Sequence, residues 1–194
     1  AQFEPVFGAE KSKSIELGMK RDFPEQNLRV NAAIHKTDIT DFQANTFTGA
    51  GFNLQNAGDI KTSGAELEVT WVPTDTMEVN FAYAYTKAEF ETFVAGNCWL
   101  ASTFHSNIQD PGRAQPTDQF CNRSGDRIAS QPEHYGVVQV KKDIAISDSI
   151  YSYAQIEFSH TGDRVMDGSS DPLHFEDSYN FENLMKEIDE SLRR

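Results

Sequence analysis

The chain has 194 residues, enough for one domain of ordinary size, and it carries 17 basic against 30 acidic side chains, a net charge of −13. This balance excludes the basic surface that nucleic acid requires, and it opposes flat binding to an anionic lipid leaflet. The sequence has no run of about 18 apolar residues, which excludes a transmembrane helix but leaves membrane-crossing strands open, because alternation hides their apolar face from such a count.

Regular alternation of apolar and polar residues predicts six β-strands. In chain order they are residues 14–22, 28–37, 65–72, 77–86, 134–142 and 150–160. The fourth shows the pattern best, since Val79, Phe81 and Tyr83 lie on one face and Asn80 and Ala82 on the other. Each strand has about the length that a tilted strand needs to cross a bilayer, roughly 9–11 residues.

The connections between the predicted strands alternate between short and long. Residues 23–27, 73–76 and 143–149 form the short connections, and residues 41–62, 87–133 and 161–178 form the long ones. Outer-membrane barrels sort their connections in this way, with short periplasmic turns and long external loops. The order therefore favours a membrane barrel over a soluble sandwich.

Individual side chains support the same interpretation. Trp71, Tyr83 and Tyr85 lie toward the ends of apolar faces, as in interfacial aromatic girdles, and Arg29 and Glu68 lie at mid-strand on the opposite face, as in a wet lumen. We therefore predict an all-β fold, an antiparallel meander of about six strands that forms part of an outer-membrane β-barrel. A soluble antiparallel sheet with one solvated face gives the same alternation and remains the alternative.

The last segment, residues 180–194, follows a helical period, with apolar residues three and four positions apart from Phe181 onward. Asn180 can cap its start, and two arginines end it, where the helix dipole favours cations. The sequence thus predicts a partial barrel over residues 1–179 and an amphipathic helical tail over residues 180–194.

The two cysteines, Cys98 and Cys121, lie in one polar, turn-rich stretch. A disulfide that closes a long exposed loop in an oxidising compartment is the interpretation that we favour, and two unrelated thiols are the alternative. In the chain-entropy model, a bond across a loop of this length contributes roughly 3 kcal/mol.

No catalytic constellation is present in the sequence and its five histidines are scattered, so we predict no enzyme activity, no metal site and no cofactor. Glu66 and Glu68 share one face of a predicted strand, where they are better explained as lumen wetting than as paired catalytic carboxylates. Asp163, Asp167 and Asp171 could bind a hard cation, but their spacing fits no defined loop and solvated acids are the simpler explanation.

Three stretches resemble a known family, the TonB-dependent receptors of Gram-negative outer membranes. Residues 10–20 (EKSKSIELGMK) are similar to a strand-entry motif of those barrels, and residues 56–74 (NAGDIKTSGAELEVTWVPT) to a loop exit followed by a strand with two inward glutamates. Residues 124–135 (SGDRIASQPEHY) resemble the segment before a later strand. The matching positions are Glu10, Lys11, Ser12, Glu16, Gly18, Asn56, Gly58, Gly64, Glu66 and Glu68.

The resemblance implies a barrel of about 22 strands in the outer membrane of a Gram-negative cell, with an N-terminal plug inside it. It also implies contact with the lipid bilayer and energy-coupled import of a scarce small-molecule ligand, such as a ferric siderophore. The TonB energising complex would be engaged only through a plug, and we find neither a plug nor a coupling box in the sequence. The start, AQFEPVFGAEK, also lacks the features of a signal peptide.

We therefore expect a segment of a receptor that is competent for transport only within a complete barrel, whether it is a natural truncation or an excised piece. The alternatives are a soluble antiparallel β binding module and a non-functional truncated fragment.

Aromatic residues in the predicted long loops are the candidates for ligand contact, because external loops of such receptors contact ligands and aromatic rings stack on planar groups. They are Phe47, Phe52, Phe93, Trp99, Phe104 and His105. The alternative is that these side chains only pack the loop around its disulfide.

Overall fold

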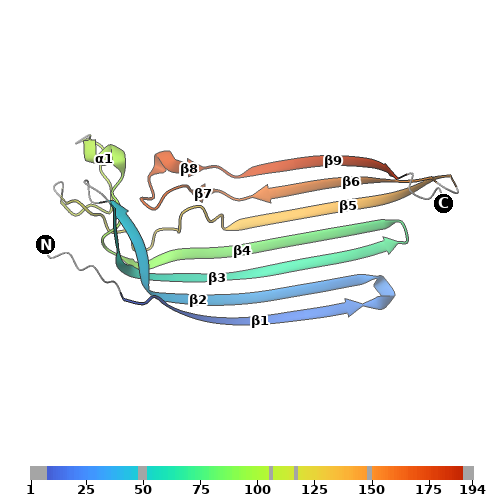
Figure 1. Ribbon diagram of the computed structural model, residues 1–194, viewed down its shortest axis with the longest axis horizontal. Coiled ribbons are helices and arrows are strands. Elements are labelled where there is room, and N and C mark those ends of the chain that lie inside the picture. Colours follow the sequence, from blue (N-terminus) through green and yellow to red (C-terminus); the bar gives the residue numbers. More distant parts are fainter. Residues whose placement is uncertain (1–7, 48–51, 105–106, 116–117, 148–149, 190–194) are drawn as a thin grey trace.

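The computed structural model of the chain describes residues 8–47, 52–104, 107–115, 118–147 and 150–189. Its main feature is a seven-stranded antiparallel sheet in the order β1-β2-β3-β4-β5-β6-β9 (Figure 1). The strands are β1 (Lys11–Phe23), β2 (Leu28–Phe47), β3 (Phe52–Thr74), β4 (Met77–Phe93), β5 (His134–Ser147), β6 (Ile150–Thr161) and β9 (Tyr179–Asp189). The connections contain the hairpin β7 (Arg164–Val165) and β8 (Phe175–Glu176), helix α1 (Leu100–Phe104), and the 3₁₀ turns η1 (Pro24–Gln26) and η2 (Pro172–His174).

Short and long connections lie at opposite ends of the sheet. The tight β1–β2, β3–β4 and β5–β6 connections lie at one end, and α1, β7 and β8 lie at the other, which we call the loop end (Figure 1). In the first turn, Asn27 adopts a left-handed conformation with φ of 50° and donates its main-chain N–H to the Pro24 carbonyl at 3.2 Å. Asparagine enters this region more readily than most residues, which makes the turn possible.

All six predicted strands are present, but β2 and β3 run far beyond their predicted ends. Residues 41–62, predicted as a long loop, are mostly strand, and the hairpin pairs up to Phe47↔Phe52. That prediction was wrong because the N–H and C=O groups of two antiparallel strands hydrogen-bond to each other whatever the polarity of the side chains. Polar residues can therefore continue a hairpin ladder. Similarly, β4 continues to Phe93, into a second predicted loop.

The predicted helical tail is wrong for the described residues. Residues 179–189 form β9, which pairs with β6 from Thr161↔Tyr179 to Tyr151↔Asp189, and residues 190–194 lie outside the described part of the chain. The helical spacing is real, but an edge strand that offers a partner for all 11 residues outweighs the weak helix preference of one short segment. The fold is therefore an all-β meander with seven strands in its main sheet.

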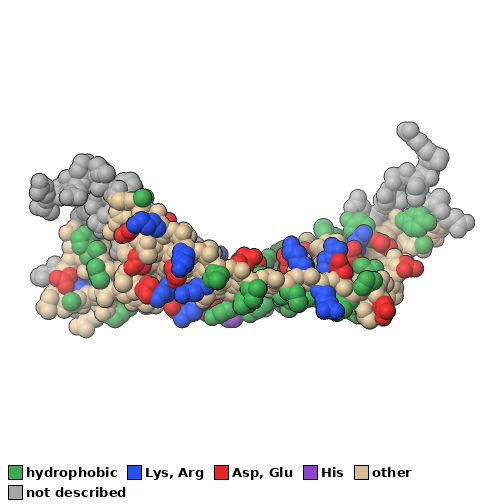
Figure 2. Space-filling view, turned by 90° about the horizontal axis from the view of Figure 1, so that it is seen from below, with side chains coloured by type: hydrophobic (Ala, Val, Ile, Leu, Met, Phe, Trp, Pro, Cys, Tyr) green, Lys and Arg blue, Asp and Glu red, His purple; other side chains and the backbone are tan. Residues whose placement is uncertain are grey.

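The register collects apolar side chains on one side of the sheet, which we call the apolar face. One of its rows runs across five strands through the partners Val30, Val69, Phe81, Val138 and Phe158. The apolar face is solvent-accessible, and Ile15 and Leu17 on β1 are each 71% exposed. Figure 2 looks onto the β1 edge and shows hydrophobic side chains gathered along the lower boundary of the middle of the sheet.

The opposite side, the polar face, carries a ladder of hydrogen-bonded polar side chains. Arg29 Nε donates to Asp22 Oδ1 at 2.6 Å, and Asn31 Nδ2 donates to Glu68 Oε2 at 3.1 Å. Farther along, Thr70 donates to Asn80 at 3.0 Å and Gln139 to Glu157 at 3.2 Å. The two faces thus differ as a lipid-facing and a water-facing surface would.

The buried core lies at the loop end instead of the middle of the sheet. Ile60, Phe90 and Phe93 are each 6% exposed, with Ile39, Phe42, Ala44 and Ile128 packed around them. Ile39, Ile60 and Phe90 share the side of the polar face, because their register continues that of Thr37↔Thr62 and Thr62↔Ala88 without interruption. The side that is polar along most of the sheet is therefore apolar and covered at the loop end. No helix in the described part of the chain is long and apolar enough to cross a membrane.

Candidate functional site

The connection between β4 and β5, residues 94–133, folds into a compact unit that we call the disulfide loop. Cys98 and Cys121 form a disulfide, and isolated bridges Glu89↔Arg127 and Gly96↔Cys121 align the returning segment with β4. The backbone bonds Arg123 N–H to Phe93 O (2.7 Å) and Ile128 N–H to Ala88 O (2.9 Å) continue this alignment. The loop thereby takes the place beside β4 that β5 occupies lower in the sheet.

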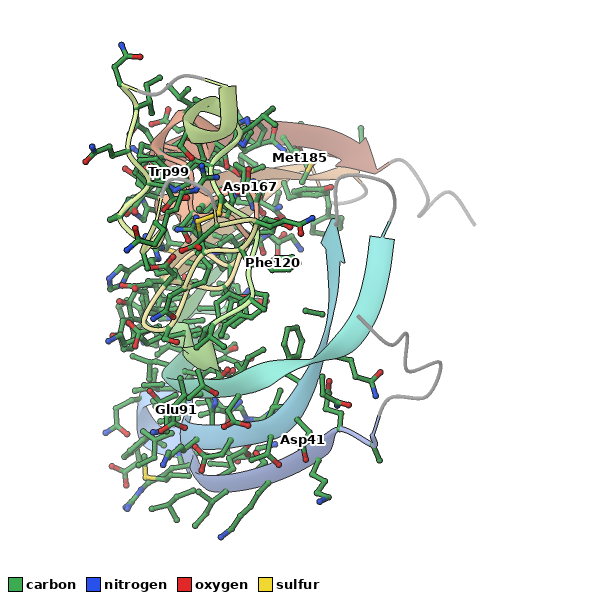
Figure 3. The ribbon with its side chains drawn as sticks, turned by 90° about the vertical axis from the view of Figure 1, so that its left-hand side faces the viewer. Asp41, Glu91, Trp99, Phe120, Asp167 and Met185 are labelled. Atoms are coloured by element: carbon green, nitrogen blue, oxygen red, sulfur yellow. A yellow bond between two sulfur atoms is a disulfide. The ribbon has the colours of Figure 1, made fainter. Side chains whose placement is uncertain are left out.

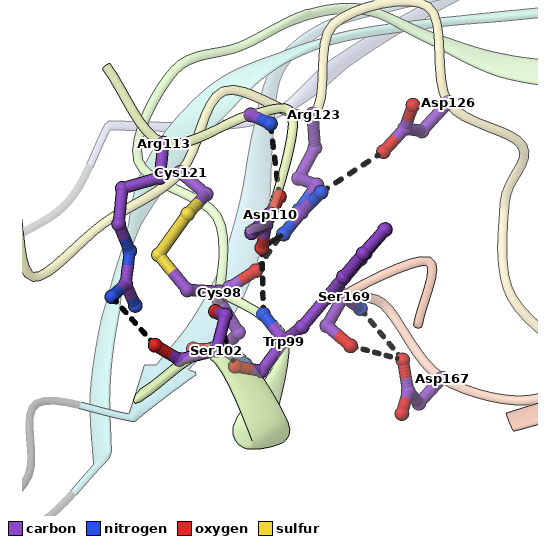
Figure 4. A network of polar contacts seen from close by, with 12 residues as sticks. Cys98, Trp99, Ser102, Asp110, Arg113, Cys121, Arg123, Asp126, Asp167 and Ser169 are labelled. Carbon is purple, nitrogen blue, oxygen red and sulfur yellow. Dashed lines mark hydrogen bonds and ion pairs between the residues drawn. A yellow bond between two sulfur atoms is a disulfide. The ribbon is translucent and has the colours of Figure 1, made fainter. Parts of the chain in front are cut away.

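A buried ion pair holds the interior of the disulfide loop. The Arg123 guanidinium pairs with Asp110, and their side chains are 2% and 0% exposed (Figure 4). The second Asp110 oxygen accepts the Gly112 N–H at 2.9 Å, the first also accepts the Trp99 N–H at 2.7 Å, and Arg123 Nε donates to the Asn97 carbonyl at 2.9 Å. Because the carboxylate and guanidinium are this well partnered, we assign them to holding the loop's shape and not to binding a ligand.

A groove of about 480 Å³ lies on the surface of this unit. The groove is lined by Trp99 and other residues of the disulfide loop, and by one residue, Ser170, of the connection between β6 and β9 (residues 162–178). The remaining lining residues are Pro111, Gly112, Ala114, Asn122, Arg123, Ser124 and Asp126. The two longest connections therefore meet at the loop end, and this groove is where they do so.

The β6–β9 connection uses its acidic side chains for internal contacts. Asp163 accepts from Arg127 at 2.7 Å, and this hydrogen bond lowers the pKa of Asp163. Asp171 accepts the Leu173 N–H at 2.9 Å, which caps η2. The three aspartates considered for a cation, Asp163, Asp167 and Asp171, thus have separate partners.

Asp167 and His174 form a side-chain pair within the same connection. Burial raises the pKa of Asp167, but hydrogen bonds from Ser169 and His174 outweigh it, and the pKa lies below its ordinary value. The hydrogen bond to Asp167 raises the pKa of His174. The pair connects the segment after β7 to η2 and keeps the connection folded back on itself.

Five of the six candidate aromatic residues lie in the part of the chain that the structure describes, and they belong to different elements. Phe93 is buried, with its ring centroid 4.7 Å from that of Phe90, so it serves the core instead of an exposed surface. Trp99 lines the groove of the disulfide loop, and Phe104 ends α1 nearby in the chain. Phe47 and Phe52 are backbone partners at the far end of the β2–β3 hairpin, and His105 lies outside the described residues.

Three of the motif residues that resemble the receptor family, Glu10, Asn56 and Gly58, come together at the bend of the β2–β3 hairpin. Asn56 accepts the Gly8 N–H at 2.7 Å, and its amide donates to the Asp41 carbonyl at 2.6 Å. Glu10 accepts the Gln43 N–H at 3.1 Å. These contacts, which we call the bend clamp, tie the segment before β1 to the hairpin. Register shifts near Asp41 and Asp59 mark bulges, and beyond them the hairpin bends away from the sheet (Figure 3).

Gly58 explains why this bend needs a glycine. Its φ is 153°, and a Cβ at this position would lie 1.7 Å from the Thr92 carbonyl oxygen. Gly64 is similarly close-packed, because a Cβ would lie 2.4 Å from the Tyr85 oxygen and 2.5 Å from His35 Nε2. Both glycines therefore permit a close approach of neighbouring strands that a residue with a Cβ would not allow.

The remaining motif residues lie on β1 and β3. Glu16, Gly18, Glu66 and Glu68 line a hollow of about 500 Å³ on the polar face, and Glu68 also lines a second one of about 300 Å³ together with Arg29. Lys11 lies 4.0 Å from Asp41, and Ser12 pairs with Ile39 in the β1–β2 ladder. Both glutamates, Glu66 and Glu68, therefore lie on the polar face of the sheet.

An antiparallel, open sheet with an apolar and a polar face, tight turns at one end and folded loops at the other defines a section of membrane barrel wall. The sequence matches the family model for the TonB dependent receptor-like β-barrel over residues 2–181, and the chain belongs to this family. No curated protein matches the sequence.

Solved receptor structures share the fold. The ferric yersiniabactin uptake receptor FyuA from Yersinia pestis aligns with a TM-score of 0.64 and 18% identity, over 90% of this chain and 22% of that receptor. The siderophore receptor PiuA from Acinetobacter baumannii aligns with a TM-score of 0.60 and 17% identity, over 90% and 22%. The ferric-catecholate import receptor Fiu from E. coli K12 aligns at 0.51 and 19%, over 92% and 21%. The chain thus spans about a fifth of the length of these receptors.

Proposed function

We propose that this chain is a section of the wall of an outer-membrane receptor that imports a scarce small-molecule ligand. The observation that carries the proposal is the pairing of an exposed apolar face with a hydrogen-bonded polar face on one sheet whose long connections all lie at one end. In a bilayer the apolar face meets lipid, the polar face lines the lumen, and the loop end is external. The chain is competent for transport only within a complete barrel, because an open sheet edge in lipid leaves backbone groups unpaired.

The ligand that we propose is a ferric siderophore. FyuA is a ferric yersiniabactin uptake receptor, PiuA is a siderophore receptor, and Fiu is a ferric-catecholate import receptor, and this chain shares their fold. In the present chain the ligand contact that we favour is the groove beside Trp99, because an indole ring offers a stacking surface and the groove lies where the two longest connections meet. We assign no catalytic role, cofactor or resident metal to any residue.

The partners follow from the same proposal. The apolar face contacts the lipid of the Gram-negative outer membrane, and the hollows lined by Glu66 and Glu68 face the lumen, where a plug would lie. Contact with the TonB energising complex would run through that plug and not through this section of wall.

A soluble antiparallel binding module is the competing function, and the exposed apolar side chains argue against it. Ile34 on β2 is 57% exposed and Ile156 on β6 is 58% exposed, in addition to Leu17 on β1. These side chains lie on one face of a continuous sheet, and a contiguous apolar surface of this extent is rare on soluble monomers.

The test is whether the chain folds in detergent micelles or in plain buffer. We expect far-ultraviolet circular dichroism of β-structure and resistance to protease in detergent micelles, and aggregation without amphiphile. A monodisperse sample that unfolds cooperatively in plain buffer would contradict the barrel wall. For the ligand, quenching of Trp99 fluorescence by a ferric catecholate complex, measured in a Trp71→Phe background, tests the groove.

A further inference from the structure

Several polar side chains around the groove of the disulfide loop are already hydrogen-bonded within the protein. Arg123 and Asp110 pair with each other in its floor, and the Ser102 hydroxyl donates to the Trp99 carbonyl at 2.8 Å. Groups that are committed in this way give the groove its shape, and a ligand would have to break a bond to use them. The groups that a ligand can use are those with no such commitment.

Ser170, which lines the groove from the β6–β9 connection, has two unfavourable features at once. Its hydroxyl oxygen is buried without a hydrogen-bond partner among the described residues, so it gives up water and gains nothing in return. Its φ of 55° lies in the left-handed region, which is uncommon for a residue other than glycine. Such features persist mainly where function requires them. Because Ser170 lines the groove, rotation about its Cα–Cβ bond can bring the hydroxyl to a molecule that lies there.

The residues on either side of Ser170 hold it in place. The main-chain N–H and the hydroxyl of Ser169 donate to Asp167 Oδ1 at 2.8 and 2.6 Å (Figure 4), and Asp171 accepts the Leu173 N–H at 2.9 Å. Ser169 and Asp171 are 8% and 4% exposed. Ser170 therefore lies between two anchored residues, and its position in the groove is set before any ligand arrives, which lowers the entropy cost of binding.

Two further donors line the groove from the disulfide loop, Asn122 and Ser124. Asn122 Oδ1 accepts the Ser124 N–H at 3.0 Å, which orients the amide, while its Nδ2 donates to none of the residues that the structure describes. Ser124 Oγ accepts the Phe93 N–H at 2.9 Å, and its own proton likewise goes to none of them. Each side chain is thus fixed through its acceptor and keeps its donor available. We call Asn122, Ser124 and Ser170 the donor set.

The groove offers no net positive charge to a ligand. The Arg123 guanidinium pairs with Asp110 and lies 3.6 Å from Asp126, so one cation faces two carboxylates. Attraction for the oxygen atoms of a ligand must therefore come from the neutral donors. Hydrogen bonds from neutral donors to charged oxygens are stronger than those to neutral ones, so a donor set of this kind suits the oxygens of a chelator.

We propose that the donor set binds the oxygen atoms of a ligand whose planar part stacks on Trp99, and that it thereby determines which ligands the groove accepts. The inference rests on the proposed function and deepens it, because it names the side chains that recognise the ligand and the chemistry that they require. A catecholate complex of iron has both features, since its oxygens surround the metal at the edge of planar rings. Such a ligand would contact both connections at once, because Ser170 belongs to one and Asn122 and Ser124 belong to the other.

The experiment titrates the chain in detergent micelles with a ferric catecholate complex, in a Trp71→Phe background that leaves Trp99 as the remaining tryptophan of the two. Ser170→Gly removes the hydroxyl and suits the left-handed backbone. Ser130→Gly is the matched control, because Ser130 also has a left-handed φ, 64°, and lies outside the lining of the groove. From quenching of Trp99 we expect binding to Ser170→Gly to be weaker by about threefold to tenfold, and binding to Ser130→Gly to be unchanged.

Asn122→Asp tests the direction of the hydrogen bonds. It keeps the oxygen that accepts the Ser124 N–H and replaces the donor amide by a carboxylate. We expect binding of the ferric catecholate to weaken by about tenfold or more, because the carboxylate repels the ligand oxygens. Tighter binding would mean that the ligand presents donors, as the hydroxyl groups of a sugar do, and would overturn the proposal.

The outcomes separate the donor set from the proposed function, and circular dichroism of each variant in the same micelles reports whether it is folded. A wild-type chain without β-structure in micelles would overturn the proposed function and the donor set with it. A folded wild-type chain whose Trp99 is not quenched would overturn the groove as the ligand contact. Quenching with equal affinity in Ser170→Gly and Ser130→Gly would overturn the donor set and leave the proposed function standing.

Discussion

Replacing Asp110 by asparagine removes the charge that balances Arg123 inside the disulfide loop. Both side chains are almost fully buried, and breaking a buried ion pair by removing one partner costs about 3–5 kcal/mol. The loop packs on the upper part of β4, beyond the β4–β5 ladder. We therefore expect the substitution to lower the free energy of opening the loop and to leave the free energy of unfolding the sheet unchanged. This loss corresponds to a rise of roughly 150-fold to 5,000-fold in the open population.

Native-state hydrogen exchange in detergent measures this opening directly. The reporters are the Arg123 amide, bonded to the Phe93 carbonyl at 2.7 Å, and the Cys121 amide, bonded to the Gly96 carbonyl at 2.9 Å. Asp126→Asn is the matched control, because Asp126 is 33% exposed and lies 3.6 Å from Arg123, a pair worth less than about 1 kcal/mol. Equal protection of both amides in the Asp110 and Asp126 variants would refute the claim that the buried pair holds the loop.

Three further predictions address the sheet, the bend and the β6–β9 connection. Val69→Arg in the middle of the apolar face should weaken partitioning into amphiphile by about 2–4 kcal/mol, whereas Thr70→Arg on the polar face should leave it nearly unchanged, as a detergent partition assay would show. Gly58→Ala should expose the β2–β3 hairpin to protease, because its Cβ would overlap a carbonyl oxygen of β4 at 1.7 Å, and a wild-type digestion pattern would disprove this. The pair of His174 and Asp167 should be most stable in a window near pH 4 to 6.5. The contribution of His174, whose pKa is raised, is lost as pH rises through that pKa, and the contribution of Asp167, whose pKa is lowered, is lost as pH falls through it. A proton-NMR titration of His174 should therefore give a midpoint above that of a free histidine.

The candidate site could be predicted from the sequence only in part. The pairing of Cys98 with Cys121 was the favoured interpretation because both lie in one loop-like stretch, and the structure shows the bond. The buried ion pair was not anticipated, because Asp110 and Arg123 are 13 positions apart in an irregular segment where no periodicity relates them. The sequence offers only an aspartate and an arginine on either side of a segment that contains glycine, proline and a cysteine. This combination is too common to predict an ion pair.

Phe93 shows why loop aromatics are difficult to assign from sequence. As an aromatic residue beyond the expected end of a strand, it was a candidate for ligand contact, but β4 continues to it and turns its ring into the cluster with Phe90. Asn56 and Gly58, in contrast, were noted only as a resemblance to a family. The structure supplies the physical reason for them, since the amide of Asn56 bonds two other segments and Gly58 faces a carbonyl oxygen.

What the sequence determined by itself is the alternation along each strand and the order of short and long connections, because both depend on neighbouring residues and on turn chemistry. From these came the two faces of the sheet and the membrane architecture. What only the tertiary structure decided is how far each strand runs and what its last segment becomes. Residues 180–189 carry a helical period, yet the open edge of β6 makes them a strand, and residues 41–62 look like a loop, yet they pair with each other. Whether a segment becomes a strand depends on the neighbouring strand with which its backbone can pair, and the local sequence pattern does not encode that neighbour.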